Sequence, residues 1–220
     1  VLVPPRTAQP GFWFGGGHIC RDAEGALLLC GRYRNGGDSR VGLEAGVRGF
    51  EIAVFRSTDE GGTFQHALSL GKADVAPEGQ EVLSIEGSCL RRTAEGLELY
   101  VSSEKRRAYP ARVGEFQKPG TGVWSIDVLR APSAERLADA RAEPLLCSEE
   151  PASLHVKDPV TFELGDGRAF LAYCVHPFSW TSSSTALAEV MPDGSLQRRG
   201  GPLLPRGPVW DVAVCRLTAR

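Results

Sequence analysis

The sequence predicts an all-β chain built from repeated four-stranded antiparallel units. Apolar and polar residues alternate with period two in short runs, and Gly, Pro and Asp turns separate the runs about every eight to twelve residues. Helical periodicity is nearly absent, and the one candidate, 132–143, is interpreted as a turn leading into an outer strand. At four places a polar residue stands just ahead of a short apolar strand: His18, Glu86, Asp158 and Asp211.

These strand starts belong to an internal repeat. After the first three, an acidic residue and a glycine precede the next apolar strand, at Glu24-Gly25, Glu95-Gly96 and Asp166-Gly167. Repeats of this size indicate stacked structural units. Four antiparallel strands per unit are typical of a β-propeller, in which each unit is a blade around a central channel. Glu86 lies ten residues before its glycine and Asp158 nine, which a one-residue bulge would explain.

The alternation also places the strands of each expected blade. Blade 1 (about 11–71) contains strands at 16–22, 26–34, 50–57 and 65–71; blade 2 (about 80–148) at 86–92, 97–104, 122–130 and 142–147; blade 3 (about 153–204) at 158–164, 168–175, 184–191 and 196–203. A fourth blade begins at about 208–220. Because a closed ring needs roughly four to eight blades, we expect a truncated product or partial gene model. The alternative is that a partner chain supplies the missing blades.

Charge and composition exclude several classes of partner. The formal net charge of −2 argues against a surface for nucleic acid, which needs clustered Lys and Arg. No apolar run approaches the ~20 residues of a membrane span. We expect no membrane partner and a cytoplasmic location, with secretion as the alternative because the chain starts at Val1 and an N-terminal segment could have been removed. The sequence does not indicate an oligomeric state.

The six cysteines predict neither a metal site nor a cofactor. Their spacing fits no zinc pattern, and most lie in apolar strand-like stretches, where a free thiol behaves as a small hydrophobic group. We expect buried reduced thiols. A disulfide between Cys20 and Cys30, on neighbouring antiparallel strands, is the alternative.

Residues 57–64, STDEGGTF, form a recognisable hairpin motif. The Asp59 carboxylate is placed to accept backbone N–H groups across the turn, Gly61 to supply a positive φ, and Phe64 to pack between sheets. The motif fits the Asp box of sialidases and related propellers. It predicts a folding device on the outer side of a blade and not a catalytic site.

Beyond this motif the chain resembles the five-bladed propeller glycoside hydrolases of families 43, 32 and 130 and sialidase-like relatives. Lys157-Asp158-Pro159 looks like the R-D-P or K-D-P that opens an inner strand in those enzymes, and segments 11–17 and 48–64 look like the opening of the same group. The resemblance implies a five-bladed type of ring. It also implies that Asp158 supports the sugar in the transition state, while a separate Asp base and Glu acid transfer protons.

The chain departs from these families in three places. Where blade 1 would bring an aspartate, it brings His18. The R-I-P segment of true sialidases is replaced by Val3-Pro4-Pro5-Arg6, and the N-D-P-N-G motif of family 32 is absent. Sialidase activity is therefore less expected than the Asp box alone would suggest.

The candidate catalytic residues are three carboxylates, Asp158, Glu86 and Asp211, because convergent carboxylates cleave glycosidic bonds. Glu86, in apolar surroundings, is the expected proton donor, with Asp158 and Asp211 as partners that activate water or attack carbon. The alternative for Asp158 is a turn carboxylate that holds a backbone N–H, and the alternative for Glu86 is an exposed edge glutamate. The candidate substrate-binding residues are His18, Arg32, Arg34, Glu104, Lys105, His176, Trp180 and Trp210. The tryptophans and His18 could instead be core residues.

The sequence therefore predicts a glycosidase-like propeller that acts on carbohydrate, without metal or cofactor. Two alternatives remain: a non-catalytic carbohydrate-binding or scaffolding propeller, and a glycoside phosphorylase that uses Arg32, Arg34 and Lys157 to hold phosphate. The Gly- and Pro-rich loop at 104–121 is a candidate lid, or else a solvated surface loop.

Overall fold

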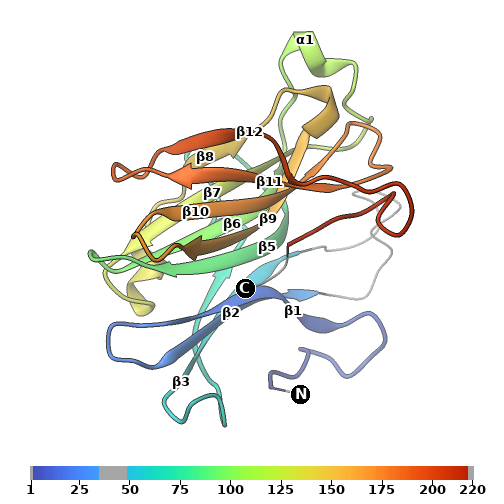
Figure 1. Cartoon of the computed structure of the whole chain (residues 1–220). Helices are drawn as coiled ribbons and strands as arrows, with labels where there is room; N and C mark the ends of the chain where they lie inside the picture. Colours follow the sequence, from blue (N-terminus) through green and yellow to red (C-terminus); the bar gives the residue numbers. More distant parts are fainter. Residues whose placement is uncertain (1, 35–48, 218–220) are drawn as a thin grey trace.

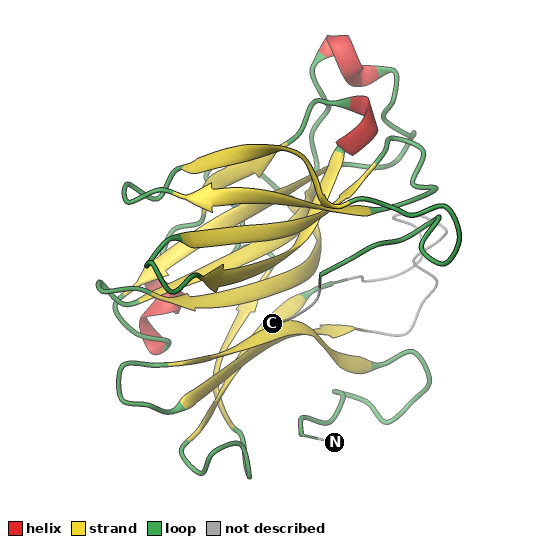
Figure 2. Ribbon diagram, viewed as in Figure 1, coloured by secondary structure: helices red, strands yellow, loops and turns green. Residues whose placement is uncertain are grey.

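The computed structural model describes residues 2–34 and 49–217. Arg48 and residues 218–220, which belong to segments discussed above, lie outside the described residues. The described part contains three four-stranded antiparallel sheets, each a blade of a β-propeller (Figures 1 and 2). The predicted all-β class and its four-stranded units are confirmed.

The strands follow the chain in order within each blade. Blade 1 consists of β1 (Trp13–Arg21), β2 (Leu27–Arg34), β3 (Glu51–Ser57) and β4 (Gln65–Gly71). Blade 2 consists of β5 (Val82–Arg92), β6 (Leu97–Lys105), β7 (Val123–Ala131) and β8 (Glu143–Cys147). Blade 3 consists of β9 (His155–Glu163), β10 (Ala169–His176), β11 (Ser184–Val190) and β12 (Leu196–Leu204). Each bound lies within a few residues of the predicted one.

Helical structure is limited to short turns in the described residues. The helix α1 spans Ala111–Gly114, and 3-10 turns span Glu135–Asp139 and Pro151–Ser153. The 3-10 turn at Glu135–Asp139 lies in the segment interpreted as a turn before an outer strand, and it buries Leu137. No helix in the described ranges is long and apolar enough to cross a membrane.

Blade 2 lies between the other two blades. Its inner strand β5 contacts the inner strands β1 and β9, and Figure 1 shows the blue and orange sheets on either side of the green one. One apolar layer joins blades 1 and 2 and a second joins blades 2 and 3; they include Leu28, Ile52, Ile85 and Leu99, and Tyr100, Ile126, Leu171 and Tyr173, respectively. As a result β6 is buried along its whole length.

The hairpin between β3 and β4 is closed by Asp59. Its carboxylate accepts hydrogen bonds from the Thr63 N–H at 2.9 Å, the Thr63 hydroxyl at 2.7 Å and the Ser57 hydroxyl at 2.7 Å. These bonds, the Thr63 N–H first, lower the pKa of Asp59 to about 2. Gly61 has a φ of 88°, and Phe64 packs against the cluster that contains Phe55. The contacts of this motif therefore stabilise the turn.

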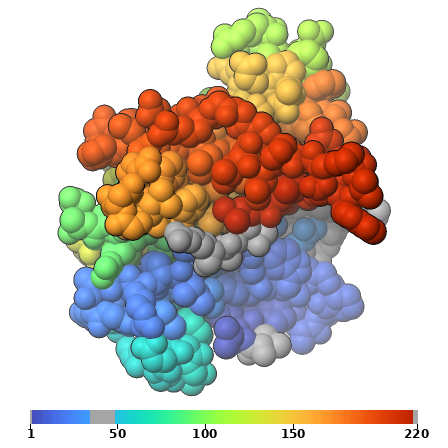
Figure 3. All heavy atoms as spheres, viewed as in Figure 1, coloured from blue at the N-terminus to red at the C-terminus, as the bar shows by residue number. Residues whose placement is uncertain are grey.

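The predicted inner strand at 208–220 is not formed within the described residues. Segment 205–217 contains bends and one parallel bridge, Ser183 to Val214, supported by the Ser183 N–H to Ala213 O bond at 2.8 Å. Figure 3 shows this segment, in red, against the strands of blade 3. A strand needs a partner for its backbone groups, and the chain around Ser183 supplies only a single bridge.

All six cysteines are free thiols. Cys30, Cys89 and Cys174 are buried as expected, whereas Cys147 is exposed. The alternative Cys20–Cys30 disulfide is not formed: Cys20 pairs with Leu28 across the ladder, and Cys30 with His18. Burial raises the pKa of Cys20 to about 12.

Candidate functional site at the channel mouth

All three inner strands carry a β-bulge at the same place. In β1, β5 and β9 the inner strand advances three residues while its partner advances two. Bulges of this kind re-aim side chains and are common next to active sites. The bulged pairs are Gly16-Gly17, Glu86-Gly87 and Asp158-Pro159. Glu86 and Asp158 are therefore equivalent positions, as the repeat predicted.

His18 is not the blade 1 counterpart of these two carboxylates, and that prediction is wrong. The equivalent residue is Gly16, whose φ of 67° resembles the 53° of Asp158. His18 follows the bulge and lies opposite Cys30, with its Nδ1 buried and without a partner among the described residues. Burial lowers the pKa of His18, opposed by a hydrogen bond with the Leu90 backbone. The offset arises because the bulge inserts a residue that sequence alignment cannot place.

The bulge in β5 also does not explain the ten-versus-nine spacing before the turn glycines. Both β5 and β9 contain the same bulge, so it cancels. The difference lies between the bulge and the turn, where β5 continues to Arg92 before Gly96 and β9 only to Glu163 before Gly167.

Arg32 from β2 fills the space that Gly16 leaves. A Cβ on Gly16 would lie 3.7 Å from the Arg32 Nε. The guanidinium forms an ion pair with Glu86, donates to the Ile85 carbonyl at 3.0 Å, and lies 5.2 Å from the ring centroid of Trp13. Glu86 is thus paired with a cation, and the lone carboxylate in apolar surroundings that a proton donor would need is not found.

Ser102 on β6 joins the bulges of blades 2 and 3. Its buried hydroxyl donates to the Gly87 carbonyl at 3.0 Å and accepts the Asp158 N–H at 3.1 Å. Gly87 must be a glycine, because a Cβ there would lie 2.7 Å from Asp158 Oδ1. This close approach brings Glu86 and Asp158 to neighbouring positions at one end of the channel, which we call the mouth.

Asp158 has a cationic partner of its own. Arg216 Nη1 lies 3.5 Å from its Oδ2, and both side chains are about one-third exposed, at 34%. The same guanidinium contacts Nε2 of His176 at 3.1 Å. His176, a predicted substrate-binding residue, and Asp158 are therefore both in contact with the Arg216 side chain.

Glu104 and Lys105 do not line the mouth, contrary to prediction. Both are 1% exposed, inside blade 2. The Lys105 ammonium lies 2.6 Å from Asp127 Oδ2 and donates to the hydroxyls of Ser103 and Ser125. Glu104 accepts the N–H of Gly122 at 2.8 Å. Burial lowers the pKa of Lys105 and raises that of Asp127, with each partner opposing the shift of the other. The pair is structural, because blades on both sides cover β6.

The structure does not bring Asp211 and Trp210 to the carboxylates. Asp211 lies in a bend of segment 205–217, beside Gly207, and not at a strand start. Trp210 is 97% exposed. Arg34 lies at the end of β2, with its guanidinium 6.0 Å from the Trp13 ring centroid. Among the predicted catalytic carboxylates, the mouth thus unites Glu86 and Asp158 only.

An aromatic cluster lies beside Asp158, in the seam between blades 2 and 3. Trp180, a predicted residue, stacks on His155 with ring centroids 4.0 Å apart and contacts His176 at 4.7 Å and Trp124 at 5.6 Å. Lys157 lies over the rings of Trp124 and Trp180. His155 and Trp124 were not predicted as part of this cluster.

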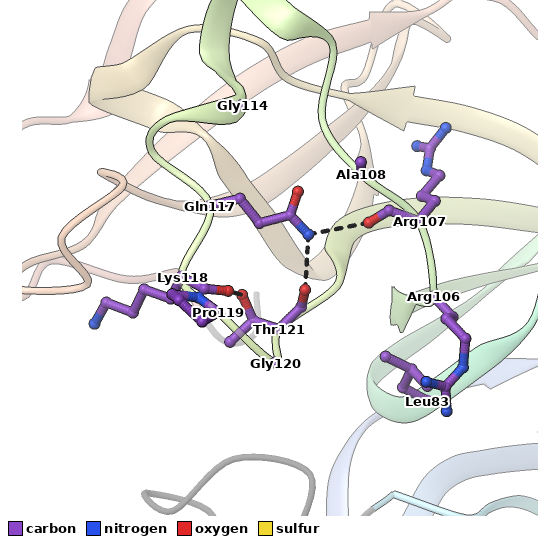
Figure 4. Close-up of a pocket in the computed structure, with 10 residues that line it drawn as sticks. All are labelled: Leu83, Arg106, Arg107, Ala108, Gly114, Gln117, Lys118, Pro119, Gly120 and Thr121. Atoms are coloured by element: carbon purple, nitrogen blue, oxygen red, sulfur yellow. Dashed lines mark hydrogen bonds between the residues drawn. The ribbon is translucent and has the colours of Figure 1, made fainter.

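The loop between β6 and β7 packs against blade 3. The Tyr109 hydroxyl donates to the Leu154 carbonyl at 3.1 Å, and Phe116 contacts Phe178 with ring centroids 4.8 Å apart. Gln117 holds the loop by donating to the carbonyls of Arg107 and Thr121, as Figure 4 shows. These contacts favour neither of the two interpretations made from the sequence, a lid or a solvated surface loop.

Two hollows lie away from the carboxylates. One, of about 480 Å³, lies under this loop (Figure 4). The other, of about 1330 Å³, lies between the hairpins at the opposite end of the blades and is lined by residues such as Arg91 and Glu163. Within residues 2–34 and 49–217, no group of three or more His, Cys, Asp or Glu side chains could hold a metal ion.

Sequence reasoning missed three contributors to the mouth: Gly16, Ser102 and Arg216. Gly16 has no side chain, so its residue type does not mark it as part of a site. Ser102 looks like an ordinary strand residue, and only the register of β6 against two bulges gives it a role. Arg216 comes from a segment that was assigned to another strand.

Comparison with known proteins rests on structure alone. No family model matches the chain, and no curated protein matches it. Solved structures do match: a thermostable family-43 glycoside hydrolase (TM-score 0.55, 14% identity, 95% of this chain and 58% of that one) and an α-L-arabinofuranosidase from Lactobacillus brevis (0.59, 12%, 94% and 59%). A β-1,2-mannobiose phosphorylase from Listeria innocua also matches (0.57, 15%, 97% and 67%).

The chain spans 58% and 60% of the length of the first two solved structures that it resembles, the family-43 hydrolase and an exo-1,5-α-L-arabinanase. At these identities the likeness concerns the fold. The chain shares its fold with these solved structures.

Proposed function

We propose that the mouth binds carbohydrate and takes part in cleaving a glycosidic bond, with Asp158 as the central carboxylate. The observation that carries this proposal is the pair of equivalent bulges that present Glu86 and Asp158 side by side, linked through Ser102. Two carboxylates at one site are the usual requirement for glycoside hydrolysis.

The two carboxylates have different surroundings. Asp158 is paired with Arg216 but is one-third exposed, so a sugar carbon or its attacking water can reach its carboxylate. Glu86 is bonded to Arg32 and to the Ser84 hydroxyl at 3.2 Å, which suits a group that accepts sugar hydroxyls. The contacts with Arg32 and Ser84 fix this carboxylate in place, so we assign Glu86 to holding the sugar.

In hydrolysis the bond between the anomeric carbon and the leaving oxygen breaks; the hydroxyl of a water bonds to the carbon, and the other proton of that water ends on the leaving oxygen. A second candidate is phosphorolysis, in which a phosphate oxygen bonds to that carbon instead. It is favoured by Lys157, because phosphate needs cationic donors, and it requires that Arg32 or Arg216 exchange its carboxylate partner for the phosphate. The third candidate, a binding propeller, uses the same mouth without turnover.

The experiment is a turnover screen on a panel of aryl glycosides, with and without inorganic phosphate. We expect release of the aryl group by the unchanged chain and a loss of at least about 100-fold in Asp158→Asn. Asp211→Asn, a carboxylate away from the mouth, is the matched control and should retain full activity. Turnover only with phosphate would favour phosphorolysis, and sugar binding without turnover would favour the binding propeller. Equal activity of Asp158→Asn and the unchanged chain would refute the assignment.

A further inference from the structure

Lys157 occupies an unusual position at the seam between blades 2 and 3. Its Nζ lies 5.2 Å from the ring centroid of Trp124 and 5.4 Å from that of Trp180, and the two rings meet edge to face. The two aromatic faces therefore hold the ammonium in place through cation–π attraction. Lys157 and Trp180 are both partly exposed, so a ligand at the mouth can reach them.

The ammonium has no carboxylate partner among the described residues. Asp158, its neighbour in sequence, is paired with Arg216. Glu86 is paired with Arg32, and Glu104 accepts the N–H of Gly122. A lysine next to a binding site and without an anionic partner is placed to receive a negative charge from a ligand.

The two histidines at the seam do not alter this charge. Burial first, and then the charge of Lys157, lowers the pKa of His155 to about 4 and that of His176 to about 3. Both rings are neutral at pH 7. Nε2 of His155 is buried without a hydrogen-bond partner in the described part of the chain, directly beside the stacked Trp180 ring. Besides Lys157, the cations whose charges act on these rings are Arg216 at His176 and Lys118, an exposed lysine of the β6–β7 loop, at His155.

We propose that this seam is a subsite for an acidic sugar, in which Lys157 binds the ring carboxylate of a uronic acid and Trp180 packs against the ring. This inference rests on the proposed carbohydrate-binding function of the mouth. A carboxylate fits better than a phosphate, because a single ammonium, that of Lys157, is held against the two rings. The two guanidinium groups that would grip a phosphate are already bonded to Glu86 and Asp158.

The experiment measures equilibrium binding to the whole chain by calorimetry at low salt. The probes are the methyl glycosides of glucuronic, galacturonic and mannuronic acid, each with its neutral parent glycoside, and inorganic phosphate. We expect at least one uronide to bind about tenfold or more tightly than its neutral parent, since a charge-assisted hydrogen bond contributes at least that factor.

The variant Lys157→Met keeps the contact with both rings and removes the charge, and it should abolish the preference for the uronide while neutral sugars still bind. Arg136→Met, which removes an exposed cation on the 3-10 turn at Glu135–Asp139, away from the seam, should leave the preference intact. Equal affinity for each acid and its parent, or a preference that survives in Lys157→Met, overturns the inference and leaves the proposed function standing. Phosphate binding without uronide binding also overturns it. If no sugar binds at all, both the inference and the proposed function fail.

Discussion

Two ion pairs in this chain show how the same kind of residue becomes structural or functional. Lys105 and Asp127 lie 2.6 Å apart inside blade 2, each 1% exposed, while Arg216 and Asp158 lie 3.5 Å apart at the mouth, each 34% exposed. The two pairs lie at corresponding places in their blades, because Lys105 at the end of β6 is equivalent to His176, which contacts Arg216, at the end of β10. The pairs differ in how they are covered. Blades flank β6 on both sides, which leaves no room for a ligand beside Lys105.

The largest expected effect concerns the buried pair of Lys105 and Asp127. Lys105→Met should lower the free energy of unfolding by about 3–5 kcal/mol, because it leaves Asp127 as a buried carboxylate without its counter-charge. Urea unfolding followed by fluorescence measures the change. The double variant Lys105→Met/Asp127→Leu should recover most of the loss, since apolar replacements of a buried pair are often neutral. A double variant no more stable than the single one would contradict a desolvated pair.

The next effect is a dependence of stability on pH that originates at the seam. His155 and His176 have pKa values of about 4 and about 3 in the folded chain, chiefly through burial, against about 6.5 when unfolded. Between these values the unfolded chain binds protons that the folded chain does not, so stability falls as pH falls from about 6.5 to about 4. For each histidine the loss is on the order of 2 kcal/mol.

Urea unfolding at pH 7 and pH 4.5 tests this dependence. His155→Gln should lose less stability on acidification than the unchanged chain, whereas His66→Gln, at an exposed position of β4, should lose as much. An identical loss in His155→Gln would show that this histidine is not the source.

A smaller effect is expected where the two bulges meet. Gly87→Ala should cost about 1–3 kcal/mol, because the new Cβ would lie 2.7 Å from Asp158 Oδ1 and 2.9 Å from its Cα. Gly165→Ala, where an added Cβ meets nothing within 4 Å, is the matched control and should change stability by less than about 0.5 kcal/mol. Equal stabilities of the two variants would mean that the bulges are not in contact.

The smallest effect on stability is expected for the mouth pair itself. Asp158→Asn should change the free energy of unfolding by less than about 1 kcal/mol, since a partly exposed ion pair contributes little. The same substitution should remove function. The mouth pair should therefore matter more for function than for stability, and the buried Lys105–Asp127 pair more for stability than for function. A loss as large as that of Lys105→Met would place Asp158 in the structural class.

The sequence predicted the blades well, because alternation and turn residues are local signals. It also predicted that Glu86 and Asp158 are equivalent. It misplaced His18, because the bulge at Gly16-Gly17 adds a residue that no local signal marks. It could not separate Arg32 at the mouth from Lys105 in the core, because burial depends on which blades flank each strand. Arg216 reaches Asp158 through tertiary contacts of an irregular segment, which periodicity cannot predict.

The central claim is that the bulges of β5 and β9 form a carbohydrate site, and a crystal structure of the chain with a bound arabino- or manno-oligosaccharide tests it most directly. The account predicts a sugar ring at the mouth, in contact with Asp158 and Glu86 and beside Trp180. A sugar bound instead in the hollow beside Gln117, or between the hairpins near Arg91 and Glu163, with the mouth empty, would contradict it.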